Sequence, residues 1–145
     1  MSKKTVPSPV GIITASDWGY RFLTERGYKV TGGFAGLREL DRFFDDHVDE
    51  STHQPTPGGA LADQTDMTLV AIGMYLGEIL LRNYGGRWAL ASDDYVLPQL
   101  LPTIALNMDN GVECWPVKRV CKRVYEGRAN RIYDYATSGI LSESK

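Results

Sequence analysis

The chain has 145 residues, a formal net charge of -2 and a hydrophobic share of 43%. This composition excludes a mostly disordered chain, which would have fewer apolar residues and a larger net charge. The small net charge also argues against a protein whose whole surface binds nucleic acid or a membrane. Since a domain usually takes about 100–200 residues, we expect residues 1–145 to form a single domain.

The sequence predicts neither a secretory signal nor a membrane span. A secretory signal needs ~7–15 consecutive apolar residues, but the N-terminal apolar stretch runs only from Val10 to Ile13. The longest apolar-rich segment, Met67 to Leu81, falls short of the ~18–20 residues that cross a bilayer. We expect a cytoplasmic protein with no membrane partner. Cys114 and Cys121, the only cysteines, should be free thiols, as is usual in a reducing compartment.

The first third of the chain predicts two helices after a flexible arm. Residues 1–9 form the arm because two prolines interrupt regular structure. Residues 10–14 favour a short strand, and residues 17–26 favour a helix with Ser16 as its N-cap. Apolar residues recur at spacings of three and four over residues 34–49, which predicts a second helix. Its polar side is made of charged residues: Arg38, Asp41, Asp45 and Asp49.

The middle of the chain predicts a surface loop and then the longest helix. Residues 51–65 are turn formers and polar residues, typical of a surface loop. Residues 66–84 carry an apolar arc wider than half the circumference, so this helix should be mostly buried. Only a strip around Ala71, Glu78 and Arg82 is left for solvent. Gly73 and Gly77 lie inside this helix, where we expect another part of the backbone to pack closely.

After Gly85-Gly86 the pattern changes to short strands and turns. We expect strands at residues 87–91, 95–97 and 103–108 and another from Val112, with an Asn-Gly turn between the last two. Pro116 suits the first position of a helix over 116–126. A short helix over 129–137 and a polar tail at 142–145 follow. The predicted fold is α+β: a small antiparallel sheet of three or four strands packed on a long buried helix with flanking helices.

One run of residues carries a family resemblance. Gly73-Met74-Tyr75-Leu76-Gly77-Glu78 is followed by Gly85-Gly86-Arg87-Trp88. This run resembles a family of small uncharacterised bacterial domains with a Gly-x-Tyr-Leu-Gly-Glu helix and a Gly-Gly-x-Trp segment, and Pro116, Val120 and Arg123 fit a further family pattern. Some members are encoded near toxin–immunity loci. The resemblance implies a bacterial, immunity-like protein and transfers no catalytic residue.

The same run supplies a candidate binding site, made of Tyr75, Glu78, Arg82, Arg87 and Trp88. Glu78 precedes Arg82 by four residues, the spacing of a helical ion pair, so a structural salt bridge is one interpretation. The alternative is a pocket in which the Glu78 carboxylate, beside a phenol and a guanidinium, binds a ligand or does acid–base chemistry.

Charge is distributed unevenly along the chain. Residues 39–50 hold six acidic residues and one basic residue, whereas residues 113–131 hold six basic and two acidic residues. On the helix 116–126, four cations are expected opposite the valine stripe: Lys118, Arg119, Lys122 and Arg123. A solvated helix face, an acidic protein partner and a nucleic acid are three interpretations of this surface.

The two histidines, His47 and His53, lie among acidic residues. Imidazole and carboxylate groups can together bind zinc or a similar ion, but the spacing matches no metal motif, and we expect no metal and no cofactor. The function that we expect is a non-catalytic protein-interaction domain, immunity-like or an adaptor. The alternatives are a small enzyme or ligand-binding domain with a pocket at Tyr75, Glu78 and Arg82, and, less favoured, nucleic-acid binding through residues 116–126.

Overall fold

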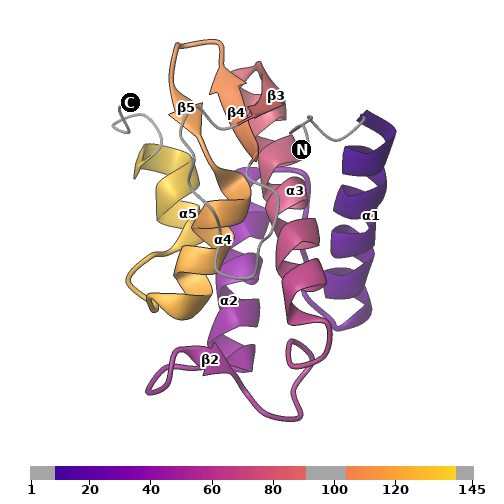
Figure 1. The fold of residues 1–145 in the computed structure, drawn as a ribbon, viewed down its shortest axis with the longest axis vertical. Helices are drawn as coiled ribbons and strands as arrows, with labels where there is room; N and C mark the ends of the chain where they lie inside the picture. Colours follow the sequence, from indigo (N-terminus) through magenta and orange to yellow (C-terminus); the bar gives the residue numbers. More distant parts are fainter. Residues whose placement is uncertain (1–8, 91–103, 140–145) are drawn as a thin grey trace, which may run out of the picture.

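The computed structural model describes residues 9–90 and 104–139, which form an α+β fold (Figure 1). The predicted fold class is confirmed. The elements, in chain order, are α1 (Pro9–Glu25), the 3-10 turn η1 (Phe34–Gly36), α2 (Leu37–His47), β1 (Val48–Asp49), β2 (Gln54–Pro55), α3 (Thr65–Tyr84), β3 (Gly86–Leu90), β4 (Ile104–Met108), β5 (Glu113–Cys114), α4 (Pro116–Tyr125), α5 (Ile132–Asp134) and the π-helical turn η2 (Tyr135–Gly139). The predicted strand at 95–97 and the tail at 142–145 lie outside the described residues, as does the arm up to residue 8.

The described strands form two small antiparallel sheets. One has the order β3-β4-β5, with Trp88 opposite Leu106 and Leu106 opposite Cys114. The turn predicted between β4 and β5 is present, and Gly111 adopts the φ of 90° that glycine tolerates there. The second sheet pairs β1 with β2. These short strands lie where the sequence predicted the end of a helix and a surface loop.

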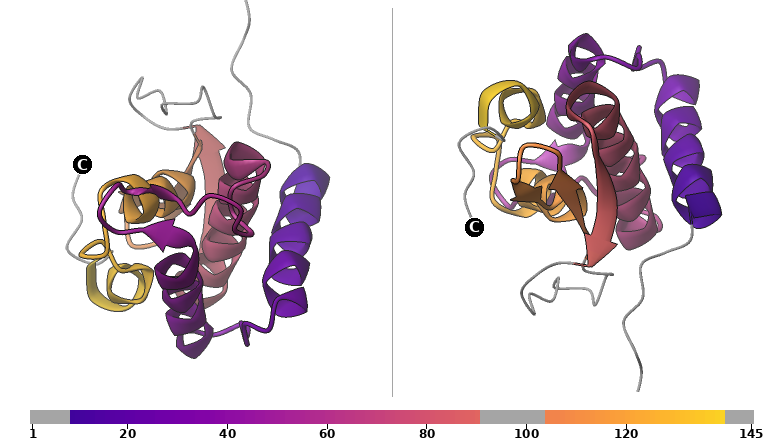
Figure 2. Two further views of the ribbon diagram at one scale, coloured as in Figure 1. Left: turned by 90° about the horizontal axis from the view of Figure 1, so that it is seen from below. Right: turned by 90° about the horizontal axis from the view of Figure 1, so that it is seen from above.

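Helix α3 is the centre of the fold and packs between α1 and α4 (Figure 2). Its buried face includes Leu69, Ile72, Leu76 and Leu80, all fully buried. The predicted solvent strip is only partly correct: Arg82 is exposed and Glu78 half-buried, but Ala71 is buried. The strip is narrow because α1 covers it.

Glycines allow helices to approach α3 on both sides. A Cβ at Gly19 of α1 would lie 2.9 Å from the Ala71 carbonyl oxygen, which explains why α1 can cover Ala71. On the other side, a Cβ at Gly73 would lie 2.6 Å from the Val117 Cα of α4. A Cβ at Gly77 would collide with the Trp88 ring. The close backbone approach predicted here is present at Gly73, whereas at Gly77 the space is taken by the Trp88 and Pro116 side chains.

The predicted start of the first helix was wrong: residues 10–14 are helical and belong to α1. Pro9 is the first residue of that helix, a position where proline is tolerated because its missing N–H has no intrahelical acceptor. Ser16 is consequently an interior helix residue and not an N-cap. At the other end, the backbone N–H of Tyr28 bonds the Leu23 carbonyl and Gly27 has a φ of 90°, so the predicted glycine stop is present.

Three further details concern loops, cysteines and membranes. The predicted loop 51–65 contributes Leu61 to the core, where its side chain is fully buried. Cys114 and Cys121 form no disulfide, as predicted, and both are buried; burial raises the pKa of Cys121 to about 12. Within residues 9–90 and 104–139, no helix combines the length and apolar character of a bilayer-crossing segment.

The contact at Gly73 gives a stability test. Gly73→Ala should lower the free energy of unfolding in urea, because overpacking against backbone costs about 1–3 kcal/mol and the gain in helix propensity returns about 1 kcal/mol at most. Gly33→Ala is the control, since a Cβ there meets no atom within 4 Å. Equal stability of the two variants would contradict the close α3–α4 packing.

Candidate functional site

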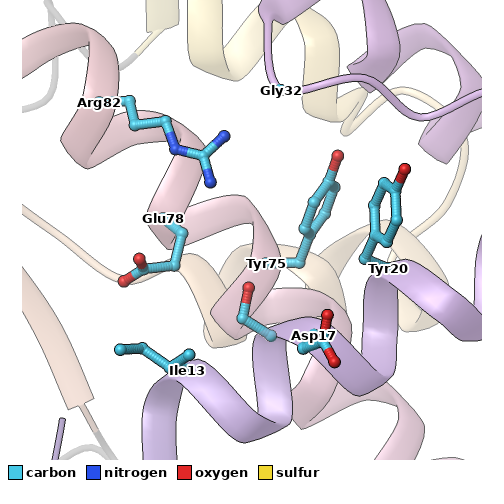
Figure 3. Close-up of a pocket in the computed structure, with 8 residues that line it drawn as sticks. Ile13, Asp17, Tyr20, Gly32, Tyr75, Glu78 and Arg82 are labelled. Atoms are coloured by element: carbon cyan, nitrogen blue, oxygen red, sulfur yellow. The ribbon is translucent and has the colours of Figure 1, made fainter. Parts of the chain in front are cut away.

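A hollow of about 390 Å³ lies between α1 and α3 (Figure 3). Its lining comes from three segments: Ile13, Ser16, Asp17 and Tyr20 of α1, Gly32 of the following connection, and Tyr75, Glu78 and Arg82 of α3. Both helices contribute residues at spacings of three, four and seven, which place side chains on one helix face. We call this hollow the α1–α3 pocket.

Three of the five predicted binding residues meet in this pocket, and two do not. Tyr75, Glu78 and Arg82 are lining residues. Trp88 lies behind Glu78 and donates a hydrogen bond of 2.9 Å from its Nε1 to the Glu78 carboxylate. Arg87 is exposed on β3 and is not among the lining residues. The strand alternation explains the difference, because successive side chains of β3 point to opposite faces.

Tyr75 closes one wall of the pocket. Its hydroxyl donates a 2.7 Å hydrogen bond to the Thr31 carbonyl oxygen, which fixes the connection next to Gly32. Burial, followed by the nearby Tyr20, raises the pKa of Tyr75 to about 12. The phenol is therefore protonated at neutral pH and serves the structure as a hydrogen-bond donor, not as a general base.

Arg82 lines the pocket and has no carboxylate partner among the described residues. The predicted salt bridge to Glu78 is not formed, and no carboxylate of the described residues lies within salt-bridge distance of the guanidinium. Its Nη1 instead lies against Gly32, where a Cβ would come within 2.7 Å. Figure 3 shows the guanidinium directed toward Tyr75 and the Glu78 carboxylate directed away from it.

The α1 half of the pocket was missed from the sequence. Ser16 is buried, and its hydroxyl forms no hydrogen bond with the described residues. Asp17 pairs with Arg21 at 3.1 Å on the exposed surface of α1. In the sequence, Ile13, Asp17 and Tyr20 have the spacing of one helix face. This spacing begins before residue 17, where the helix was predicted to start.

The acidic and basic stretches contact each other. Arg123 is only 1% exposed, and its Nε lies 3.1 Å from the Asp41 carboxylate while its Nη2 lies 2.5 Å from Asp45. Asp45 is also within 2.9 Å of Arg128 and 3.7 Å of Arg131. The prediction that Arg123 lies on an exposed face, either solvated or binding a partner, is therefore wrong, and so is the prediction that Asp41 lies on the polar side of its helix. A guanidinium and a carboxylate can be buried when each satisfies the other.

Three predicted cations remain on the surface of α4. Lys118, Arg119 and Lys122 are half-exposed and line a hollow of about 40 Å³ together with Trp115 and Tyr135. We call these five residues the basic-aromatic surface. The Arg119 guanidinium lies 4.2 Å from the centre of the Tyr135 ring. Neither Arg119 nor Lys122 has a carboxylate partner among the described residues.

The histidines do not form a metal site within residues 9–90 and 104–139, where no group of three or more potential ligands occurs. His47 packs against the Phe43 ring at 4.7 Å between centres. Burial lowers the pKa of His47 below its ordinary value, against the opposing effect of Asp46. His53 lies 3.9 Å from Glu50.

Comparison with known proteins yields no relative: no family model, curated protein or solved structure matches the chain.

Proposed function

We propose that the protein is a non-catalytic binding protein that takes a small polar molecule into the α1–α3 pocket. The observation that carries this proposal is the unpaired Arg82 guanidinium in a hollow of about 390 Å³, at the lower end of the ~300–1,000 Å³ typical of ligand pockets. The neighbouring Ser16 hydroxyl and Glu78 carboxylate give a ligand further polar contacts.

Several arginines form no salt bridge with the described residues, and of these Arg82 is the one that lines the α1–α3 pocket. Salt bridges to carboxylates are formed by Arg21, Arg42, Arg123, Arg128 and Arg131. Arg82 has carboxylates nearby and forms no salt bridge within residues 9–90 and 104–139, so its N–H donors remain available to an anionic group. A carboxylate or phosphate on the ligand would complete this arrangement.

The chemistry of the lining favours binding over catalysis. The described residues that line the pocket include no histidine and no cysteine, so the Ser16 hydroxyl has no imidazole to activate it. Tyr75, with its pKa raised to about 12 and its hydroxyl bonded to Thr31, does not supply a base either.

A fragment titration tests the pocket. Small carboxylate-bearing and neutral compounds are added to ¹⁵N-labelled protein, and we expect the carboxylates to shift the amide signals of Gly32 and Glu78. Arg82→Gln should weaken that binding about tenfold or more, because a charge-assisted hydrogen bond is lost. Lys29→Gln removes an exposed cation outside the pocket and should leave binding unchanged. Signals that move only elsewhere, or not at all, would overturn the proposal.

The basic-aromatic surface supports a second candidate, an immunity-like or adaptor function in which an acidic segment of a partner protein binds. Arg119 and Lys122 carry charge that no carboxylate of the described residues balances. Beside them, Trp115 Nε1 is a buried donor with no acceptor in the part of the chain that the structure describes. An acidic chain complements these cations, and Arg and Trp are common in the residues that dominate interface energetics.

Fluorescence anisotropy with a labelled octaglutamate peptide tests this second candidate. We expect binding that Lys122→Glu abolishes and that the matched charge reversal Lys29→Glu preserves. A labelled 15-mer single-stranded oligonucleotide is the competing probe. Tighter, steeply salt-dependent binding of the oligonucleotide would favour a nucleic-acid partner instead, and loss of peptide binding in both variants would show a nonspecific charge effect.

A further inference from the structure

The α1–α3 pocket holds opposite charges that do not neutralise each other. Glu78 and Arg82 are four residues apart on α3, a spacing that usually permits a salt bridge. The structure prevents it, because Trp88 Nε1 holds the Glu78 carboxylate at 2.9 Å and the Arg82 guanidinium lies against Gly32. Since Trp88 donates to Oε2, the other carboxylate oxygen of Glu78 accepts no hydrogen bond from the described residues.

A second carboxylate lies on the facing wall. Asp17 of α1 lines the same pocket, but its carboxylate lies 3.1 Å from the Arg21 guanidinium, so the charges left without a partner among the described residues are those of Glu78 and Arg82. A ligand with only an anionic group can bind Arg82 but is repelled by Glu78, and a ligand with only a cationic group can bind Glu78 but is repelled by Arg82. A molecule that carries both groups satisfies Glu78 and Arg82 together.

The pocket also offers exposed apolar surface. Ile13 is 60% exposed and Tyr20 is 41% exposed, and both are lining residues. The Tyr20 and Tyr75 rings lie 6.0 Å apart and form a wall next to the polar groups. Burying such surface is favourable by about 25 cal/mol per Å², so an apolar group on the ligand would add affinity.

We propose that the ligand is a small zwitterion with an apolar side chain, that is, a free apolar amino acid. Its carboxylate binds the Arg82 guanidinium, its ammonium group binds the Glu78 carboxylate, and its side chain contacts Ile13 and Tyr20. This inference rests on the proposed function and names the ligand class for the same pocket.

Three compounds of one skeleton separate the contributions. L-leucine has both charges, 4-methylpentanoate lacks the ammonium group, and 3-methylbutylamine lacks the carboxylate. In titrations followed by the Gly32 and Glu78 amide signals, we expect leucine to bind at least tenfold more tightly than either analogue. Glycine, which lacks the side chain, should bind more weakly than leucine.

Two variants test which side chain binds each charged group of leucine. Glu78→Gln keeps an oxygen that accepts the Trp88 hydrogen bond but removes the charge, so leucine should lose its advantage over 4-methylpentanoate. In Arg82→Gln, leucine should bind no more tightly than 3-methylbutylamine. Gly32→Ala displaces the flexible end of Arg82 and should weaken leucine binding. Gly33→Ala, which meets no atom within 4 Å, is the matched control and should bind normally.

Failure of the ligand class and failure of the proposed function give different results. If 4-methylpentanoate binds as tightly as leucine and Glu78→Gln has no effect, the zwitterion is excluded while a pocket for anions remains. If other fragments bind in the pocket and leucine does not, the ligand class is overturned and the proposed function stands. If no compound of either experiment shifts the pocket signals, both are overturned.

Discussion

The buried contact between Asp41 and Arg123 organises the second half of the structure. Arg123 Nε donates to Asp41 Oδ1 at 3.1 Å, and the backbone N–H groups of Ile132 and Tyr133 donate to the same carboxylate at 2.9 and 3.0 Å. One side chain of α2 therefore holds α4 and the start of α5. Removing either charge from such a buried pair is costly, because the partner is left in the interior without a counter-ion.

This contact changes what the uneven charge distribution means. The acidic and basic stretches are separated by about 80 residues in sequence, yet Arg123, Arg128 and Arg131 all lie within 4 Å of Asp45. Much of the polarity is therefore satisfied inside the molecule and is not available to a partner. Among the described residues, cations without a carboxylate partner include Arg82 in the α1–α3 pocket and Arg119 and Lys122 of the basic-aromatic surface.

The sequence predicted those parts of the fold that are determined by residues close together in the chain. The buried stripe of the long helix, the proline start of α4 and the Asn-Gly turn follow from spacing and turn chemistry. Asp41 and Arg123 were misplaced because a periodic pattern assigns charged residues to the solvent side, whereas their burial depends on a partner 82 positions away. The α1 half of the pocket was missed because β-branched residues near Ile13 favour a strand locally, and packing on Ala71 overrides that preference.

The central claim is that the opposite charges of the two stretches are a folding interaction. A double-mutant cycle of Asp41→Asn and Arg123→Met, measured by urea unfolding at neutral pH, tests it most directly. Each single change should cost about 3–5 kcal/mol, and the double change should cost less than their sum by about 1–3 kcal/mol. Small losses of stability in the single variants that simply add in the double variant would contradict the claim. The Asp41 and Arg123 charges would then not stabilise the fold through their contact.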